Sequence, residues 1–352
     1  MATNATVVSA MKPTMPWQPT RGDRARSVIR LLISALLTYG IVALTPLKGK
    51  LAYFFVFIAL STFITAVDKF RAGGKKAAQD SFVSALALTA GVIVFLPVAS
   101  ILFTTVSRGV KGFHKTLLTD TMAKASITDP ISMGGILHAI VGTIMIVLLA
   151  SIISVPLSIM TALYLTEIKG RASGFIQFLV QAMSGIPSIV AGIFIYAAIL
   201  VNTALRGSAI IGALALAILM IPTVTRTSQE VLRLIPNDLR EAGLALGATQ
   251  WKTVATIVLP AARSGLVTAF ILGVARIAGE TAPLLFTIGA ADTLNLNPIN
   301  GANSALPYYT WRTLTGGTPE SMQRAWTAIM VLLIVVLALF ITARSISRRR
   351  IS

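Results

Sequence analysis

The chain has 352 residues, of which 55% are hydrophobic and only 12% are charged, and its formal net charge is +18. Soluble domains carry roughly 25% charged residues, so the composition indicates a membrane protein and argues against a soluble enzyme. The chain has no cysteine, which excludes a disulfide framework, a Cys-based zinc site and a thiol nucleophile.

The positive charge does not indicate a nucleic-acid partner. The basic residues flank apolar runs and lack the aromatic interleaving of a single-strand binder. They are the pattern expected of loops held on the cytoplasmic side of a membrane. The two histidines, His114 and His138, have no partner at metal-ligand spacing, so we expect no metal site and place both at surfaces or interfaces.

Residues 1–27 are polar and proline-containing, without an apolar stretch of their own. They predict a disordered cytoplasmic tail and no cleavable signal peptide. A helix needs about 20 apolar residues to cross a bilayer, and eight later segments approach this length. These predicted spans are Val28–Leu44, Leu51–Val67, Phe82–Val106, Ile136–Leu163, Phe178–Val201, Ala209–Thr225, Ser264–Gly289 and Ala325–Ala343.

The fold class is therefore an all-α membrane protein, without the alternating pattern of a membrane β-barrel. Lys and Arg are more frequent in alternate loops when both termini are placed inside, which predicts a multi-pass protein of the cytoplasmic membrane in that orientation. Residues 345–352 form a basic cytoplasmic tail. The fifth span is uncertain at its start, because Phe175–Val180 also fits an interfacial helix.

The first two spans form an accessory hairpin that, with the basic linker Asp68–Asp80, makes a separate segment of residues 28–80. The remaining six spans form the transmembrane domain of residues 81–344. Between its last two spans, segment 290–323 is rich in Asn, Gly, Thr and Pro. A loop of this length is a docking surface for an external partner or a plain connector.

Residues 230–262, the coupling segment, are too polar to lie in lipid and predict two short helices. Asn237 or Asp238 is expected to cap the first helix, Leu239–Leu246, with Glu241 completing an acidic capping box. Gly247 suits a left-handed C-terminal cap.

Thr249 is expected to cap the second helix, Gln250–Leu259, which Pro260 should end. The small residues Ala242, Gly243 and Ala245 would let another protein approach closely. A plain amphipathic surface hairpin fits the same pattern.

The seventh span carries two opposite charges, Arg276 and Glu280, which would share one face of a continuous helix. A charge in mid-bilayer costs about 2.5–3.5 kcal/mol on insertion scales, so the two must pair or line water. With the hydroxyl of Thr281 they form either a static ion pair or a transient anion site. Breaks of the helix are expected at Gly279 and Pro283, and at Pro187 in the fifth span, as hinges.

The coupling segment resembles the Glu-Ala-Ala loop of ABC importer permeases. The matching residues are Glu241–Thr249 (EAGLALGAT) and Ile257–Pro260 (IVLP), with Gly243 in place of the third-position alanine. The resemblance implies that Glu241, Ala242, Gly243, Gly247, Ala248 and Pro260 dock on a cytosolic ATPase. The chain itself has no phosphate-binding loop of the ATPase kind, so ATP and Mg²⁺ would be used by that partner and no cofactor by this chain.

A second resemblance, to PstA-type permeases of phosphate-specific ABC importers, rests on three segments. They are Gly185–Gly192 (GIPSIVAG), Ala275–Leu285 (ARIAGETAPLL) and Gln323–Trp326 (QRAW). It implies a type I ABC importer permease fold with a six-span core and two extra N-terminal helices. It also implies that Arg276, Glu280 and Thr281 line a pathway for inorganic phosphate.

The partners implied are a PstC-like permease, two PstB-like ATPase subunits and an extracytoplasmic phosphate-binding protein, PstS, besides membrane lipid. An importer of another oxyanion, such as sulfate, molybdate or phosphonate, is the nearest alternative. A secondary transporter or channel would not need the coupling segment. A membrane enzyme is disfavoured because Glu280 is the only acid within a span, and we assign no catalytic residue.

Overall fold

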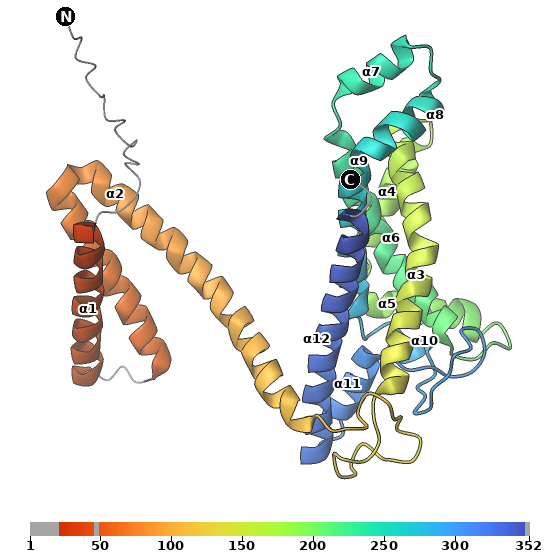
Figure 1. Ribbon diagram of the computed structural model, residues 1–352, viewed down its shortest axis with the longest axis horizontal. Coiled ribbons are helices and arrows are strands. Elements are labelled where there is room, and N and C mark those ends of the chain that lie inside the picture. The colour runs from red at the N-terminus through yellow and green to blue at the C-terminus, as the bar shows by residue number, and fades with distance from the viewer. Residues whose placement is uncertain (1–20, 46–48, 349–352) are drawn as a thin grey trace, which may run out of the picture. The chain divides into compact units, whose positions relative to one another are not determined.

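Figure 1 shows the computed structural model, which describes residues 21–45 and 49–348. The regular elements within these residues are all helices, so the predicted all-α fold is confirmed. The predicted tails lie largely outside the described residues, which exclude 1–20 and 349–352. Residues 21–27 and 345–348 instead extend the first and last helices beyond their apolar spans. Hydropathy marks the part of a helix in lipid and not its polar ends.

The chain divides into two compact units, Met1–Ile101 and Leu102–Ser352. The first unit contains α1 (Arg21–Leu44) and most of α2 (Lys50–Gly109), joined by an ion pair of 2.8 Å between Arg30 and Asp68. At about 1.5 Å per residue, α2 is about 90 Å long, far more than one crossing needs. Gly74 divides it with non-helical backbone angles (φ 71°, ψ −162°), so α2 holds the second and third predicted spans.

The division between the units falls inside the third predicted span and not at the linker before residue 81. The reason is that the start of this span packs within the first unit. Ser84 and Leu88 line a groove of about 510 Å³ together with Phe54 and Phe57 of the preceding stretch of α2.

The second unit is built around α3 (Leu137–Leu163), α6 (Ala209–Arg233) and α9 (Leu259–Ala278), with α12 (Pro319–Arg348) beside α9. Its core contains Ala150, Ala213 and Ala269, all fully buried. Small residues let membrane helices approach closely, and they compensate for the lack of a hydrophobic driving force within lipid.

The outer faces of these helices are apolar as well. On α3, Ile152 and Met160 are 69% and 68% exposed. A soluble protein would place polar residues there, whereas a bilayer requires apolar ones. Among the described residues, six helices are long and apolar enough to span a membrane, or seven with the bent pair α4–α5.

That pair is α4 (Ser173–Ser184) and α5 (Ser188–Ile195), which continues through a π-helical turn to Leu200. Their axes differ by 105°. The fifth predicted span is therefore not one straight helix, and Phe175–Val180 belong to the separate helix α4.

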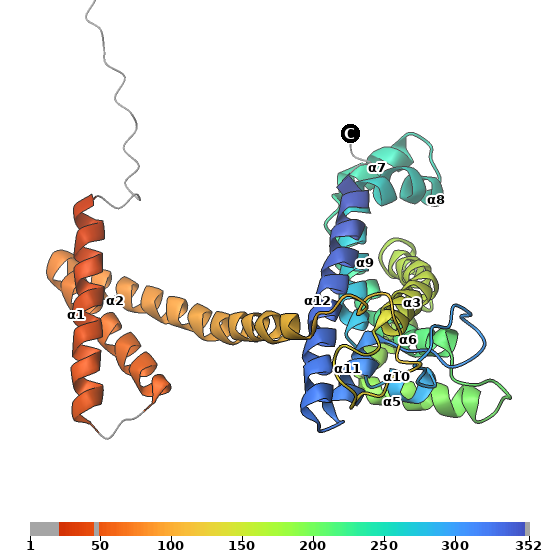
Figure 2. The same ribbon diagram turned by 60° about the horizontal axis from the view of Figure 1, so that its bottom comes forward.

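Figures 1 and 2 place α7 (Asn237–Ala245) and α8 (Gln250–Thr253) at one end of the second unit, away from α10 (Leu284–Thr287) and α11 (Leu306–Leu314). Helix α11 lies in segment 290–323, for which we predicted no helix. It buries Leu306 and Tyr309. Of the two places expected for His138, a surface or an interface, the surface is excluded, because His138 is 2% exposed with its ring 5.7 Å from that of Tyr309 in α11.

Candidate functional site

The coupling segment forms two helices at an angle, as predicted, with different ends. Helix α7 begins at Asn237 with Pro236 in the cap position, so the predicted cap at Asn237 or Asp238 is wrong. Pro236 suits the position because its backbone is already extended (φ −58°, ψ 141°). The Asn237 side chain instead accepts a hydrogen bond of 3.3 Å from Arg240.

The C-terminal cap of α7, at Gly247, follows the prediction. Gly247 has φ +79°, and its N–H donates to Leu244 O at 2.9 Å while the Ala248 N–H donates to Gly243 O at 3.2 Å. This pair of bonds is the Schellman motif, which requires a left-handed residue. Thr249 caps α8 by accepting from the Lys252 N–H at 3.4 Å.

Pro260 does not end the second helix, contrary to the prediction. After α8 a π-helical turn, Val254–Val258, leads directly into α9, in which Pro260 lies in the first turn. In the π-helical turn the Leu259 N–H bonds five residues back, to Val254 O. Because the hydrogen-bond ladder is already shifted there, the missing N–H of Pro260 is tolerated without a break.

The residues predicted to meet an ATPase differ in exposure. Glu241, Ala242, Gly247 and Pro260 are exposed, and Ala248 is half-buried. Gly243 is buried against the chain's own next helix, since an added Cβ would lie 2.8 Å from Ile257 Cδ1. Gly243 therefore permits the packing of α7 and does not belong to the exposed small face.

An ion pair that the sequence did not indicate fixes this segment. Arg240 of α7 binds both carboxylate oxygens of Glu167, at 2.8 and 2.9 Å, from the π-helical turn Tyr164–Ile168 that follows α3. The Glu167 side chain is 6% exposed and that of Arg240 is 20% exposed. The hydrogen bonds with Glu167 raise the pKa of Arg240. A clue was available, because Glu167 is one of only twelve acidic residues and directly follows an apolar span.

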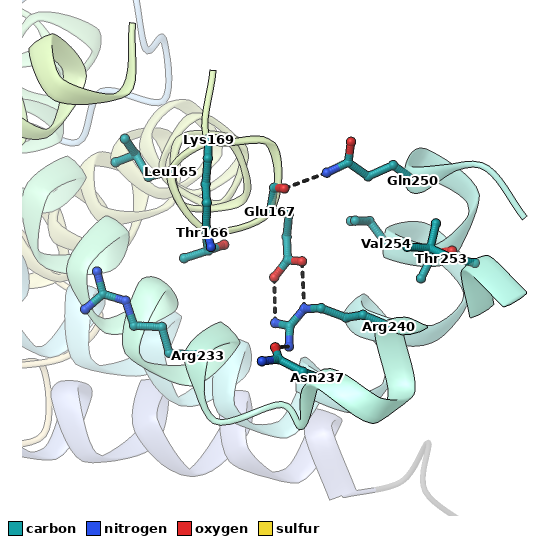
Figure 3. A pocket seen from close by; sticks show the side chains of 11 residues that line it. Leu165, Thr166, Glu167, Lys169, Arg233, Asn237, Arg240, Gln250, Thr253 and Val254 are labelled. Carbon is teal, nitrogen blue, oxygen red and sulfur yellow. Dashed lines mark hydrogen bonds and ion pairs between the residues drawn. The ribbon is translucent and has the colours of Figure 1, made fainter. Parts of the chain in front are cut away.

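Figure 3 shows this ion pair beside a cavity of about 410 Å³. Arg240 also donates to the carbonyl oxygens of Leu232 (2.8 Å) and Ile235 (2.6 Å) where α6 ends. Gln250 of α8 donates to Glu167 O at 2.6 Å. The cavity is lined by Leu165, Thr166, Glu167, Lys169, Arg233, Asn237, Arg240, Leu244, Gln250, Thr253 and Val254.

The second candidate site is the break after α9. The helix ends at Ala278, with Gly279 as its cap, so the span is interrupted where a break was predicted and is not helical throughout to Gly289. Arg276 therefore lies in the last turn of α9, where a cation is favoured by the helix dipole. Glu280 lies beyond the helix, and the two do not share a helical face.

The break lies at the mid-depth of the second unit. Gly273, three residues before Arg276, faces Met220 and Val224, which are in the middle of α6. Arg276 is exposed on the isolated chain, and Glu280 and Thr281 are half-buried. Within residues 21–45 and 49–348, the side chains of Arg276 and Glu280 have no hydrogen bond or ion pair, with each other or elsewhere.

The predicted hinge residues lie at breaks of the backbone. Pro187 is the cap of α5 at the 105° bend, Gly279 is the cap at the end of α9, and Pro283 is the cap of α10. The two breaks also touch, because a Cβ on Gly192 of α5 would lie 2.6 Å from Pro283 Cα. Whether these positions bend during function stays a prediction.

The tetrad Gln323–Trp326 has a structural place in the second unit. Gln323 donates to Arg108 O at 2.7 Å, and the Arg108 guanidinium lies 4.9 Å from the Trp326 ring centre. Arg324, 4% exposed, donates to the carbonyl oxygens of Asp129, Pro130 and Met133. These contacts fasten the start of α12 to the end of α2 and to the loop before α3.

A family model, described as a binding-protein-dependent transport system inner membrane component, matches residues 154–352. The phosphate transport system permease protein PstA 1 of Mycobacterium tuberculosis (strain CDC 1551 / Oshkosh) is 35% identical over 277 residues, 77% of this chain and 91% of that protein. PstA of Haemophilus influenzae is 37% identical over 247 residues, 69% of this chain and 85% of that protein.

Among solved structures, the inward-facing MetNI methionine ABC transporter aligns with a TM-score of 0.47 and 19% identity, over 61% of this chain and 93% of that chain. The family model covers more than half of the chain, and the relatives are matched over most of their length. The chain therefore belongs to the binding-protein-dependent transport inner-membrane components and, among them, to the PstA-type permeases.

Proposed function

We propose that this chain is a permease subunit of an ATP-driven importer and passes inorganic phosphate across the cytoplasmic membrane by alternating access. The observation that carries the proposal is the agreement between two facts. The relatives are phosphate transport permeases, and Arg276, which has no ion-pair partner among the described residues, lies one turn from a residue packed on the middle of α6 in an apolar helix bundle.

The chemistry of the break suits an oxyanion. A guanidinium presents planar donors that match phosphate oxygens, and Thr281 adds a hydroxyl. Glu280 supplies a negative charge that keeps the anion from binding too tightly. Because neither charge has a partner among the described residues, both are available to an ion or to a neighbouring subunit.

The energy source is a separate subunit in this proposal. Glu241, Ala242 and Gly247 form an exposed surface on α7 and its cap, which would dock on one of two PstB-like ATPases that use ATP and Mg²⁺. A PstC-like permease would complete the pathway beside Arg276, and a PstS-like protein would deliver phosphate. Both termini and the α7 end of the bundle are cytoplasmic in this arrangement.

The test is ATP-driven uptake of radiolabelled phosphate by the complex purified from its native membrane and reconstituted in vesicles. Arg276→Gln should lower uptake at least tenfold while the complex still assembles, because the proposed pathway loses the guanidinium of Arg276. Arg226→Gln is the matched control, since Arg226 is an exposed arginine of α6 outside the predicted span. It should leave uptake unchanged.

Two results would contradict the proposal. Undiminished uptake in Arg276→Gln would remove the site assignment. If the native complex imported sulfate or molybdate in preference to phosphate, the assignment of phosphate as the substrate would be wrong.

A further inference from the structure

The Glu167–Arg240 ion pair is more than a local cap of α7. It joins two segments 73 residues apart, and the Arg240 guanidinium at the same time donates to Leu232 O near the end of α6 and to Ile235 O just beyond it. Glu167 is thus the residue at which the π-helical turn after α3 meets α7. The Gln250 side chain also donates a hydrogen bond to the backbone oxygen of Glu167. Helix α7 is also connected along the chain to α6 and α8, and through Gly243 it packs on Ile257 of the π-helical turn Val254–Val258.

From Glu167 a continuous series of contacts leads to the break at mid-depth. The turn that carries Glu167 continues through Lys169, held in the left-handed region (φ 51°), into α4. Helix α4 bends by 105° into α5. Gly192 of α5 then touches the backbone of Pro283, next to Glu280 and Thr281.

We propose that Glu167 and Arg240 are positioning residues that form the joint through which displacement of α7 reaches the α4–α5 pair and so the break after α9. The proposal rests on the proposed function for the source of that displacement, an ATPase that moves α7. The two residues touch no transported ion. They act by keeping α7 and the Tyr164–Ile168 turn at a fixed distance while both move.

The geometry favours a rigid joint over a loose surface contact. A two-pronged guanidinium–carboxylate pair fixes orientation as well as distance. The carboxylate side chain is only 6% exposed, so little of it is accessible to water that would compete with Arg240. Arg233, which lines the same cavity, has only an exposed ion pair of 3.2 Å with Glu230, and its side chain is 59% exposed. It is therefore the natural control.

The experiment measures phosphate imported per ATP hydrolysed by the reconstituted native complex and by four variants. Glu167→Gln and Arg240→Gln should lower this ratio at least tenfold while ATP hydrolysis continues, because α7 moves without carrying the turn. The exchange variant Glu167→Arg/Arg240→Glu should recover part of the ratio, which a residue needed only for folding would not show. Arg233→Gln should keep the native ratio. Equal ratios for native, Glu167→Gln and Arg240→Gln complexes would overturn the proposal.

A second measurement does not depend on the transported ion or on the survival of these variants. This chain has no cysteine, so Leu246→Cys and Arg171→Cys place spin labels within it only at the end of α7 and just after the turn. In the otherwise native complex, the label distance should stay the same with and without ATP. A change in that distance on ATP binding would contradict the proposal that Glu167 and Arg240 form a rigid joint, even if phosphate import is confirmed. Failure of phosphate import with an unchanged distance would instead count against the proposed function alone.

Discussion

The two ends of this functional unit treat charge in opposite ways. Where α7 meets the turn after α3, all three guanidinium nitrogens of Arg240 donate hydrogen bonds, and the side chain of Glu167 is nearly buried. At the break after α9, Arg276 and Glu280 lie four residues apart and neither side chain has a partner among the described residues. A satisfied pair holds structure, whereas unpaired charges in an apolar span are costly, which is why we propose a functional role for Arg276 and Glu280.

The difference predicts opposite effects on stability. Arg240→Leu should lower the free energy of unfolding by about 3–5 kcal/mol, because it leaves the nearly buried carboxylate of Glu167 without a partner. Arg276→Leu should not lower it, because no ion pair of the described residues involves Arg276. Denaturant titration of the purified complex in micelles measures both. If Arg276→Leu lowered the free energy of unfolding and Arg240→Leu did not, the assignment of a structural role to Arg240 and none to Arg276 would be wrong.

A smaller effect is expected where the two breaks touch. Gly192→Ala should destabilise the second unit by about 1–3 kcal/mol, since its Cβ would press on backbone atoms that cannot yield. The new methyl group would lie 2.6 Å from Pro283 Cα and 2.9 Å from Pro283 O. Thermal unfolding checks the effect, with Gly174→Ala in α4 as control because nothing lies near that position. Equal behaviour of the two variants would show that the breaks are not packed together.

The smallest effect concerns the start of α8. Thr249→Ala should cost about 1 kcal/mol, because it removes the side-chain oxygen that accepts from the Lys252 N–H. Thr249→Ser keeps that oxygen and should restore stability. Thermal unfolding again distinguishes the two variants. Loss of stability in both would mean that the Thr249 methyl group, and not the cap, is what matters at this end of the unit.

The sequence could predict those features that depend on neighbouring residues. Eight apolar spans, the left-handed Gly247 and the cap at Thr249 each follow from a few adjacent positions. The prediction that Pro260 ends a helix was wrong for an instructive reason, because a π-helical turn before it accommodates the missing N–H. The breaks predicted at Gly279 and Pro283 are present, but the expectation that Arg276 and Glu280 share a helical face was wrong, because α9 ends at Ala278, between the two residues.

By itself, the sequence determined that this protein is an all-helical membrane protein with a polar coupling segment and two charges in an apolar stretch, because hydropathy and backbone preferences are local properties. Only the tertiary structure decided the partner of each charge. Glu167 and Arg240 are brought together across 73 residues by the packing of α3 against α6, while Arg276 and Glu280, close in sequence, are separated by the end of a helix. Ion pairing depends on distances of a few ångströms, and these are set by how the helices pack.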